Sequence, residues 1–389
     1  MSGISIRKIG MLTLALAFAS GAASTATRSH NVVFGAVNIG QGITLHYAEE
    51  GRGTPVIFVH GSLGDFRYWK DQVDAFAKHY RAIAYSRRYS FPNSNPARPG
   101  YSAVTDADDL AAFIKVMHLR KVYVVGHSYG ALTGLFLAVR HPQLIRALVL
   151  AEPPAVSLLN DLPGNEANAG KAMYADIERR MVAPMKADFA KGDRSAGVGV
   201  FIDYVFNDPH AWQNWSPAER AATLQDAHEW DVMMTTGELF PPISPAQVRG
   251  IKVPVLIMSG GKSYAFLGPI DRELARLIPG SQSVVFPNDG HQMWYQSPVL
   301  CRHDVEAFFR SVSRARQVSV SDHPPLEASK FAKPPSSDEL SIRGIAGRWL
   351  KKDDENKWLK TISVPEELFL GPRLKPFERR NSARSRSPP

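Results

Sequence analysis

The segment that most restricts the possible fold is Gly126-His127-Ser128-Tyr129-Gly130, which joins two regular elements. The apolar run VYVV before it is typical of a buried strand, and ALTGLFLA after it is typical of a helix. A serine on such a strand-to-helix turn has a strained backbone, and small neighbours leave room for it. Its Oγ is exposed above the sheet at the amino end of a helix, so Ser128 is a candidate nucleophile.

Short β-branched runs alternate with helical segments along most of the chain, which predicts a parallel sheet covered by helices on both faces, an α/β fold. Runs such as VIFV and VLIM are apolar throughout, as strands buried between two helix layers must be. The expected strands are 43–47, 55–59, 81–85, 121–125, 147–150, 254–258 and 283–286, with 32–37 antiparallel at one edge; the expected helices include 107–117, 129–140 and 271–277.

One interval interrupts this alternation. Residues 154–252 contain no strand pattern and are rich in Met, Trp and Phe, with helical stretches at 165–189 and 217–234. The interval predicts a helical lid inserted into a core made of residues 31–153 and 253–313. Most of the lid's aromatic side chains are expected to pack it onto that core.

The first residues follow the order of a secretory signal peptide. Arg7 and Lys8 precede an apolar run at 9–19, and small residues follow at 20–24. The run is short for a membrane span, so we expect a signal peptide in residues 1–26, a secreted or periplasmic protein, and no stable membrane insertion after cleavage. An uncleaved signal that tethers the protein to the membrane is the alternative.

The net charge of +9, from 46 basic and 37 acidic residues, raises the question of nucleic acid as a partner. Much of the excess lies after residue 313, in a segment that ends FERRNSARSRSPP. Residues 314–389 are therefore expected to form a basic, mostly disordered tail, and nucleic-acid binding is disfavoured. The single cysteine, Cys301, excludes an intrachain disulfide and a Cys-rich zinc site, and we expect neither a metal nor an organic cofactor.

Two further segments carry groups that an activated serine needs. The run VIFV ends in His60-Gly61-Ser62, a turn that can aim backbone N–H groups. The N–H groups of Ser62 and Tyr129 are expected to form an oxyanion hole, while His60 orders the loop without a catalytic role. Gly290-His291 follows the last expected strand, and His291 is the candidate base that takes the serine proton.

With the His-Gly turn, the elbow, the lid and the late Gly-His in this order, the stretch from Gly40 to Val312 resembles the α/β-hydrolase superfamily. The resemblance implies an eight-stranded, mainly parallel sheet and a Ser, acid, His triad in that chain order. It implies that Ser128 is the nucleophile and His291 the base. The serine at 128 disfavours relatives with an aspartate nucleophile, such as epoxide hydrolases and haloalkane dehalogenases.

Two positions depart from the family pattern. Ser86-Arg87-Arg88-Tyr89 stands where many members have Asp-x-Arg-Gly, so this loop is expected to be positioned differently. The usual triad acid is missing after the strand at 254–258, because the chain continues as Ser259-Gly260-Gly261-Lys262-Ser263. Some members carry the acid after the preceding strand, where this chain has Glu152, the expected acid. The alternatives are Asp271, Asp289 or a dyad without an acid.

The predicted function is that of a secreted serine hydrolase. It is expected to cleave a small or medium apolar ester, or a related activated carbonyl, through an acyl-enzyme, because the lid residues predict an apolar pocket for a small-molecule substrate. The same site can serve a carbon–carbon bond hydrolase or a perhydrolase. A non-catalytic small-molecule receptor on this scaffold is a further alternative, because the usual acid position holds no carboxylate.

Overall fold

The computed structural model describes residues 32–321. The expected signal peptide at 1–26 and the expected tail from residue 322 onward lie outside the described residues. Helix α13 (Pro298–Ser321) ends the described part. Residues 314–321 are therefore helical, whereas the sequence predicted that the disordered tail begins at residue 314.

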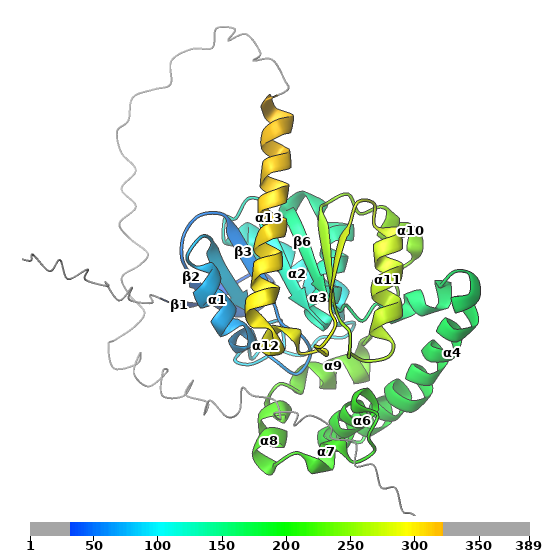
Figure 1. Ribbon diagram of the computed structural model, residues 1–389. Helices are drawn as coiled ribbons and strands as arrows, with labels where there is room; N and C mark the ends of the chain where they lie inside the picture. The colour runs from blue at the N-terminus through cyan, green and yellow to red at the C-terminus, as the bar shows by residue number, and fades with distance from the viewer. Residues whose placement is uncertain (1–31, 322–389) are drawn as a thin grey trace, which may run out of the picture. The chain divides into compact units, whose positions relative to one another are not determined.

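An eight-stranded sheet forms the centre of the described part (Figure 1), in the order β1-β2-β4-β3-β5-β6-β7-β8. β1 pairs with β2 and β2 with β4 in the antiparallel sense, and the other neighbours are parallel. The predicted fold class, a mainly parallel sheet with an antiparallel edge, is confirmed. The strands are β1 (Val33–Asn38), β2 (Thr44–Glu50), β3 (Pro55–Val59), β4 (Arg81–Tyr85), β5 (Val122–His127), β6 (Ile145–Ala151), β7 (Val255–Gly260) and β8 (Gln282–Phe286).

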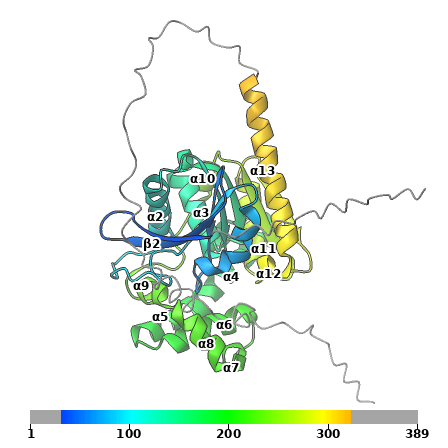
Figure 2. The same cartoon turned by 90° about the vertical axis from the view of Figure 1, so that its left-hand side faces the viewer.

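The central strands are apolar on both faces because each face packs against helices. In β5, Val122 and Val124 belong to one buried cluster, whereas Tyr123 and Val125 belong to the other. Figure 2 shows α2 and α3 on one side of the sheet and α13 on the other. The first layer consists of α2 (Ala103–Val116), α3 (Tyr129–Arg140) and α11 (Leu267–Leu277), and the second of α1 (Lys70–Phe76) and α13.

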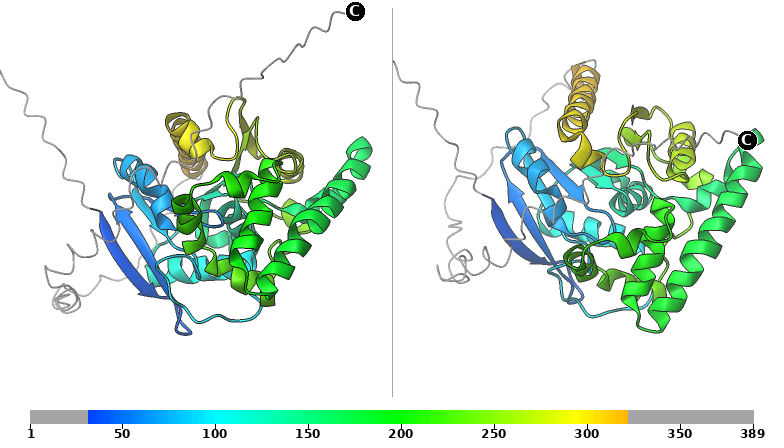
Figure 3. Two further views of the ribbon diagram at one scale, coloured as in Figure 1. Left: turned by 90° about the horizontal axis from the view of Figure 1, so that it is seen from below. Right: turned by 60° about the horizontal axis from the view of Figure 1, so that its bottom comes forward.

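The stretch between β6 and β7 is described throughout and contains helices without a strand, in agreement with a helical insertion. Figure 3 views the molecule from the side of these lid helices. The lid helices are α4 (Ala167–Ile177), α5 (Ala183–Ala190), α6 (Arg194–Phe206), α7 (Ala211–Asn214), α8 (Pro217–Gln225), α9 (His228–Thr236) and α10 (Pro245–Arg249). None of the helices within residues 32–321 combines the length and the apolar character that crossing a membrane requires.

Two expected lid helices are divided in the structure. The expected helix at 165–189 contains a π-helical turn, Glu178–Val182, between α4 and α5. The expected helix at 217–234 is interrupted between α8 and α9, where the Asp226 carboxylate accepts a hydrogen bond from the Phe91 N–H of the core at 2.9 Å. A tertiary hydrogen bond to a buried backbone group thus competes with continuation of the helix.

The turn between β5 and α3 depends on two glycines that leave room for neighbouring backbone. A Cβ on Gly126 would lie 2.4 Å from the Gly130 carbonyl oxygen. A Cβ on Gly130 would lie 2.1 Å from the Val59 carbonyl oxygen, at the end of β3. Backbone atoms cannot move aside as easily as the end of a flexible side chain, so both positions require glycine.

We predict that Gly130→Ala lowers the free energy of unfolding by about 3 kcal/mol or more, because the added methyl group overpacks a backbone contact. Denaturant unfolding followed by circular dichroism measures this change. Gly268→Ala is the matched control, since the nearest atom to its new Cβ is the Arg272 side chain at 3.6 Å. An equal stability of the two variants would contradict the packing argument.

Candidate active site

Ser128 occupies the turn between β5 and α3 with φ of 53° and ψ of −122°. A positive φ is strained for a residue other than glycine. The Ser128 N–H donates to the Ala151 carbonyl at 2.8 Å, and the Ser128 carbonyl accepts from the Ala131 N–H at 2.9 Å. These bonds hold the strained turn between β6 and the first turn of α3, and the side chain of Ser128 lines a pocket.

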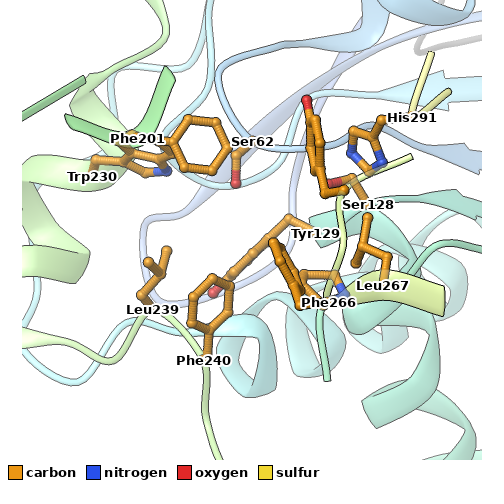
Figure 4. A pocket seen from close by; sticks show the side chains of 12 residues that line it. Ser62, Ser128, Tyr129, Phe201, Trp230, Leu239, Phe240, Phe266, Leu267 and His291 are labelled. Atoms are coloured by element: carbon orange, nitrogen blue, oxygen red, sulfur yellow. The ribbon is translucent and has the colours of Figure 1, made fainter. Parts of the chain in front are cut away.

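His291 follows β8 and lies beside Ser128 at one end of this pocket (Figure 4). Its Nδ1 is 2.5 Å from Oε2 of Glu152, so the expected histidine and the expected acid are in contact. Because Glu152 is an acceptor, Nδ1 carries the proton of that bond. Nε2 is then the ring nitrogen that is left for proton exchange with a hydroxyl.

Glu152 directly follows β6 and is almost completely buried, with a relative exposure of 1%. Its Oε1 accepts a hydrogen bond from the Gly260 N–H at 2.7 Å, and its Oε2 accepts one from the Ser263 hydroxyl at 2.7 Å. With the His291 ring as the third donor, the buried carboxylate therefore has a partner on each oxygen. Gly260 and Ser263 lie at and after the end of β7, where the family pattern has its acid. In this chain, that loop holds a carboxylate from the neighbouring strand.

The two alternative acids have other partners. The Asp271 carboxylate accepts a hydrogen bond from the Ser259 hydroxyl at 2.7 Å, and burial raises the pKa of Asp271 well above its usual value. Asp289 joins the ends of β7 and β8 through its backbone carbonyl, which accepts from the Lys262 N–H at 2.9 Å. Among the described residues, Glu152 is the acid that the structure brings onto His291.

The turn after β3 packs directly on the elbow. A Cβ on Gly61 would lie 3.1 Å from the Ser128 Cβ and 3.6 Å from its Oγ, so the backbone at residue 61 approaches the serine closely. The next residue, Ser62, and Tyr129 at the start of α3 line the same pocket as Ser128 and His291. The two expected oxyanion-hole residues and the candidate nucleophile therefore share one pocket.

His60 orders this turn from inside the core. It is fully buried, and its Nε2 accepts a hydrogen bond from the Arg87 N–H at 3.0 Å. Its Nδ1 consequently donates to the Gly61 carbonyl at 2.8 Å. Burial and the neighbouring Arg87 cation hold the pKa of His60 well below its usual value, so the ring is neutral. The Ser86-Arg87-Arg88-Tyr89 loop thus supports the turn through the Arg87 backbone.

Two aromatic rings, those of Tyr264 and His127, pack near the His291 ring, and the sequence argument did not include them. Tyr264 packs against the His291 ring with centroids 4.6 Å apart, and the His127 ring lies at 4.6 Å. Nε2 of His127 is 2.8 Å from the His291 carbonyl, and burial lowers the pKa of His127 well below its usual value. The signal for His127 is its place in the elbow motif, next to Ser128.

The pocket is mostly apolar, and residues of both the core and the lid line it (Figure 4). The space between its lining atoms, open solvent included, is about 390 Å³. No Asp, Glu, Lys or Arg is among the described residues that line it. The apolar and aromatic part of the lining consists of Pro154, Phe201, Trp230, Leu239, Phe240, Tyr264, Phe266 and Leu267, in addition to Tyr129. Within residues 32–321, no three His, Cys, Asp or Glu side chains are grouped so that they could hold a metal ion.

The sheet, the helical insertion and the strained serine at the end of β5 define an esterase-like serine hydrolase of α/β type. The sequence profile described as alpha/beta hydrolase fold matches residues 54–191. The protein "Putative carbamate hydrolase RutD" of Yersinia enterocolitica is 30% identical over 261 residues, which cover 64% of this chain and 86% of that protein. The chain therefore belongs to the alpha/beta hydrolase family, as its motifs predicted.

Other similar proteins share the fold and differ in chemistry. The 2-hydroxy-6-oxo-6-(2'-aminophenyl)hexa-2,4-dienoic acid hydrolase of Metapseudomonas resinovorans is 28% identical over 274 residues, or 67% of this chain and 86% of that protein. The crystal structure of the enol-lactonase from Burkholderia xenovorans has a TM-score of 0.55 and 21% identity, and the match covers 72% of this chain and all of that one. A further relative is matched over only 50% of its own length. These likenesses leave the substrate open.

We predict that Glu152→Gln lowers kcat by about 10⁴-fold, because an amide neither fixes the His291 tautomer nor stabilises the imidazolium. Steady-state hydrolysis of an activated ester measures the loss. Asp271→Asn is the control, since Asp271 is also a buried acid but bonds to Ser259, and it should keep kcat within a few-fold. Activity of the Glu152 variant near that of the wild type would make this residue structural.

Proposed function

We propose that this protein hydrolyses small or medium apolar esters, or related activated carbonyl compounds, through an acyl-enzyme on Ser128. The observation that carries the proposal is the buried contact between Glu152 and His291, because the His291 ring and Ser128 line one pocket. A serine hydroxyl needs a base within reach and a third group that orients the base. Ser128, His291 and Glu152 supply these three groups.

In the proposed reaction, Nε2 of His291 takes the Ser128 proton while Oγ attacks the carbonyl carbon of the ester. The carbonyl π electrons move to oxygen, and the N–H groups of Ser62 and Tyr129 donate to this oxyanion. His291 then protonates the leaving alcohol oxygen as the ester C–O bond breaks. Water attacks the acyl-enzyme with His291 as base, which releases the acid and restores Ser128.

Glu152 stabilises the cationic form of His291 that arises in each half of this cycle. Its three hydrogen-bond donors are Gly260, Ser263 and His291, so both carboxylate oxygens have partners. A carboxylate that is bonded in this way can be buried behind the imidazole at an acceptable cost in free energy. Its fixed position also keeps the His291 ring oriented toward Ser128.

The pocket lining supports an apolar substrate. Phe201, Trp230, Leu239 and Phe240 belong to the lid, and Phe266 belongs to the core. Apolar and aromatic walls bind apolar groups and exclude charged ones, because a charge would lose its hydration without gaining a partner. We therefore propose that the acyl or alcohol part of the substrate is a small or medium aliphatic or aryl group.

A carbon–carbon bond hydrolase is the second candidate, because the name of one relative describes the hydrolysis of a dienoic acid. Such a substrate carries a carboxylate, and the described pocket lining contains no arginine or lysine to pair with it. This difference favours the ester. The argument for a non-catalytic receptor rested on the missing acid after β7, and Glu152 supplies a carboxylate to that position from β6.

We further propose that the protein is exported. The support is the order of basic, apolar and small residues in the first 24 positions of the chain, which belongs to the part that the structure leaves undescribed. Fractionation of cells that express the full chain tests the proposal. A processed protein in the secreted or periplasmic fraction is expected, whereas retention in the membrane fraction would favour the tethered alternative.

We predict that a fluorophosphonate probe labels the wild type and leaves Ser128→Ala unlabelled, because the probe reacts with an activated serine Oγ. Ser62→Ala is the matched control: it removes the other serine hydroxyl of the pocket but keeps the Ser62 N–H. Its labelling should remain. Thermal unfolding of each variant establishes that the fold is intact, and equal labelling of Ser128→Ala would refute the nucleophile.

We predict that kcat/KM for p-nitrophenyl esters rises with acyl length from acetate and then falls when the chain exceeds the pocket. Each buried CH₂ adds about 0.8 kcal/mol of binding, which corresponds to roughly a fourfold rise in kcat/KM per added group until the space is filled. A panel of acyl chains of rising length measures the profile. A preference for charged or sugar esters over all members of this panel would contradict the apolar assignment.

A further inference from the structure

Arg87 is a fully buried cation directly behind the turn that carries Ser62. Its guanidinium donates to the carbonyls of that turn, to His60 O at 3.3 Å and to Gly61 O at 3.1 Å. On the core side, it pairs with Asp106 in α2 at 2.8 Å. On the lid side, it pairs with Glu229 in α9, which is also fully buried. One side chain therefore connects the turn, the core and the lid.

Glu229 reaches the same turn by a second route. Its Oε1 accepts a hydrogen bond from the Leu63 N–H at 2.9 Å, and its Oε2 contacts the Arg87 guanidinium. Leu63 follows Ser62 and has a φ of 54°, a conformation that is strained for leucine. The lid carboxylate thus stabilises a strained backbone position one residue after the candidate oxyanion donor. The next residue of α9, Trp230, lines the substrate pocket.

We propose that Glu229 and Arg87 are positioning residues that fix the Ser62 N–H for the oxyanion, so that the lid completes the oxyanion hole as well as the pocket wall. This inference rests on the proposed function, because that function makes the Ser62 N–H an oxyanion donor. Oxyanion donors act through preorganisation, and a misplacement of about 1 Å can cost about 10²-fold in rate. A lid residue adjacent to Trp230 therefore links occupation of the pocket to the geometry of catalysis.

The simpler explanation is that Glu229 only fastens the lid and neutralises Arg87. A second lid carboxylate allows the two explanations to be separated. Asp226 is buried, with a relative exposure of 4%, and accepts a hydrogen bond from the Phe91 N–H of the core at 2.9 Å. Like Glu229, it attaches the lid to core backbone, but the structure gives it no bond to residues 60–63. Asp226 is thus a matched control for lid attachment.

The experiment compares Glu229→Gln with Asp226→Asn in the full chain. Glu229→Gln replaces one of the two carboxylate oxygens with a donating NH₂ group, so the oxygen that faces the Leu63 N–H and the oxygen that faces the Arg87 guanidinium are no longer both present. Arg87 keeps Asp106 as a partner, and burial raises the pKa of Glu229 to about 7 even beside Arg87, so a neutral side chain is tolerable there. The measured quantities are kcat and KM for a p-nitrophenyl ester and the Kd for benzeneboronic acid, which forms a tetrahedral adduct on a serine Oγ.

We expect Glu229→Gln to lower kcat by about 10- to 100-fold with KM within about threefold, since removal of one oxyanion donor costs about 10²- to 10³-fold. The affinity for the boronic acid should fall by a similar factor. Asp226→Asn should keep kcat within about threefold. Equal losses in both variants, or a Glu229 variant in which only KM rises, would overturn the inference.

Two further measurements keep this result interpretable. If Glu229→Gln does not fold, Glu229→Asp replaces it, because it keeps the charge beside Arg87 and withdraws the carboxylate from Leu63 by one methylene; wild-type kcat in that variant would also overturn the inference. Fluorophosphonate labelling of the wild type tests the proposed function independently. An unlabelled, inactive wild type refutes the proposed function, whereas a labelled, active wild type with indistinguishable lid variants refutes only the role of Glu229.

Discussion

The contact between Glu152 and His291 is the interaction on which the rest of the site depends. The two residues are 139 positions apart, and their contact requires β6, β7 and β8 to end side by side. Ser128 is tied to the same edge, because its N–H bonds to the Ala151 carbonyl, one residue before Glu152. The parallel pairing of β5 with β6 therefore sets the distance between the candidate nucleophile and the acid. A shift in strand register would move the serine, the acid or the base out of reach of the others.

Local sequence was sufficient to predict a site residue where one short segment contains the whole motif. The elbow of Ser128 could be predicted because the strand, the small residues and the helix are contiguous, and His291 because it follows the last strand. Glu152 was predicted from the family resemblance, because the loop after β7 offers no carboxylate in the usual place and some members carry the acid after the preceding strand. In the structure, Gly260 and Ser263 of that loop donate hydrogen bonds to the Glu152 carboxylate.

What the sequence could not reveal depends on contacts between distant residues. The partners Arg87 and Glu229 are separated by 142 positions, and no periodicity or motif connects them. The break between α8 and α9 likewise follows from a bond between Asp226 and the Phe91 backbone, which helix propensity cannot anticipate. By contrast, the strands were predictable because a strand with helices on both faces must be apolar throughout, and each strand shows this pattern in its own sequence.

The charged side chains near the site lie behind the pocket and do not form its wall. Glu152 lies behind His291, and the pair of Arg87 and Glu229 lies behind the Ser62 turn, while the pocket itself is lined by apolar and aromatic side chains. In the proposed reaction these buried groups position His291 and the Ser62 turn, and none of them lines the pocket. Because the effective dielectric constant is low in such surroundings, an oxyanion that forms in the pocket interacts more strongly with fixed N–H groups than it would in water. The apolar lining thus supports the electrostatics of the proposed reaction, in addition to selecting an apolar substrate.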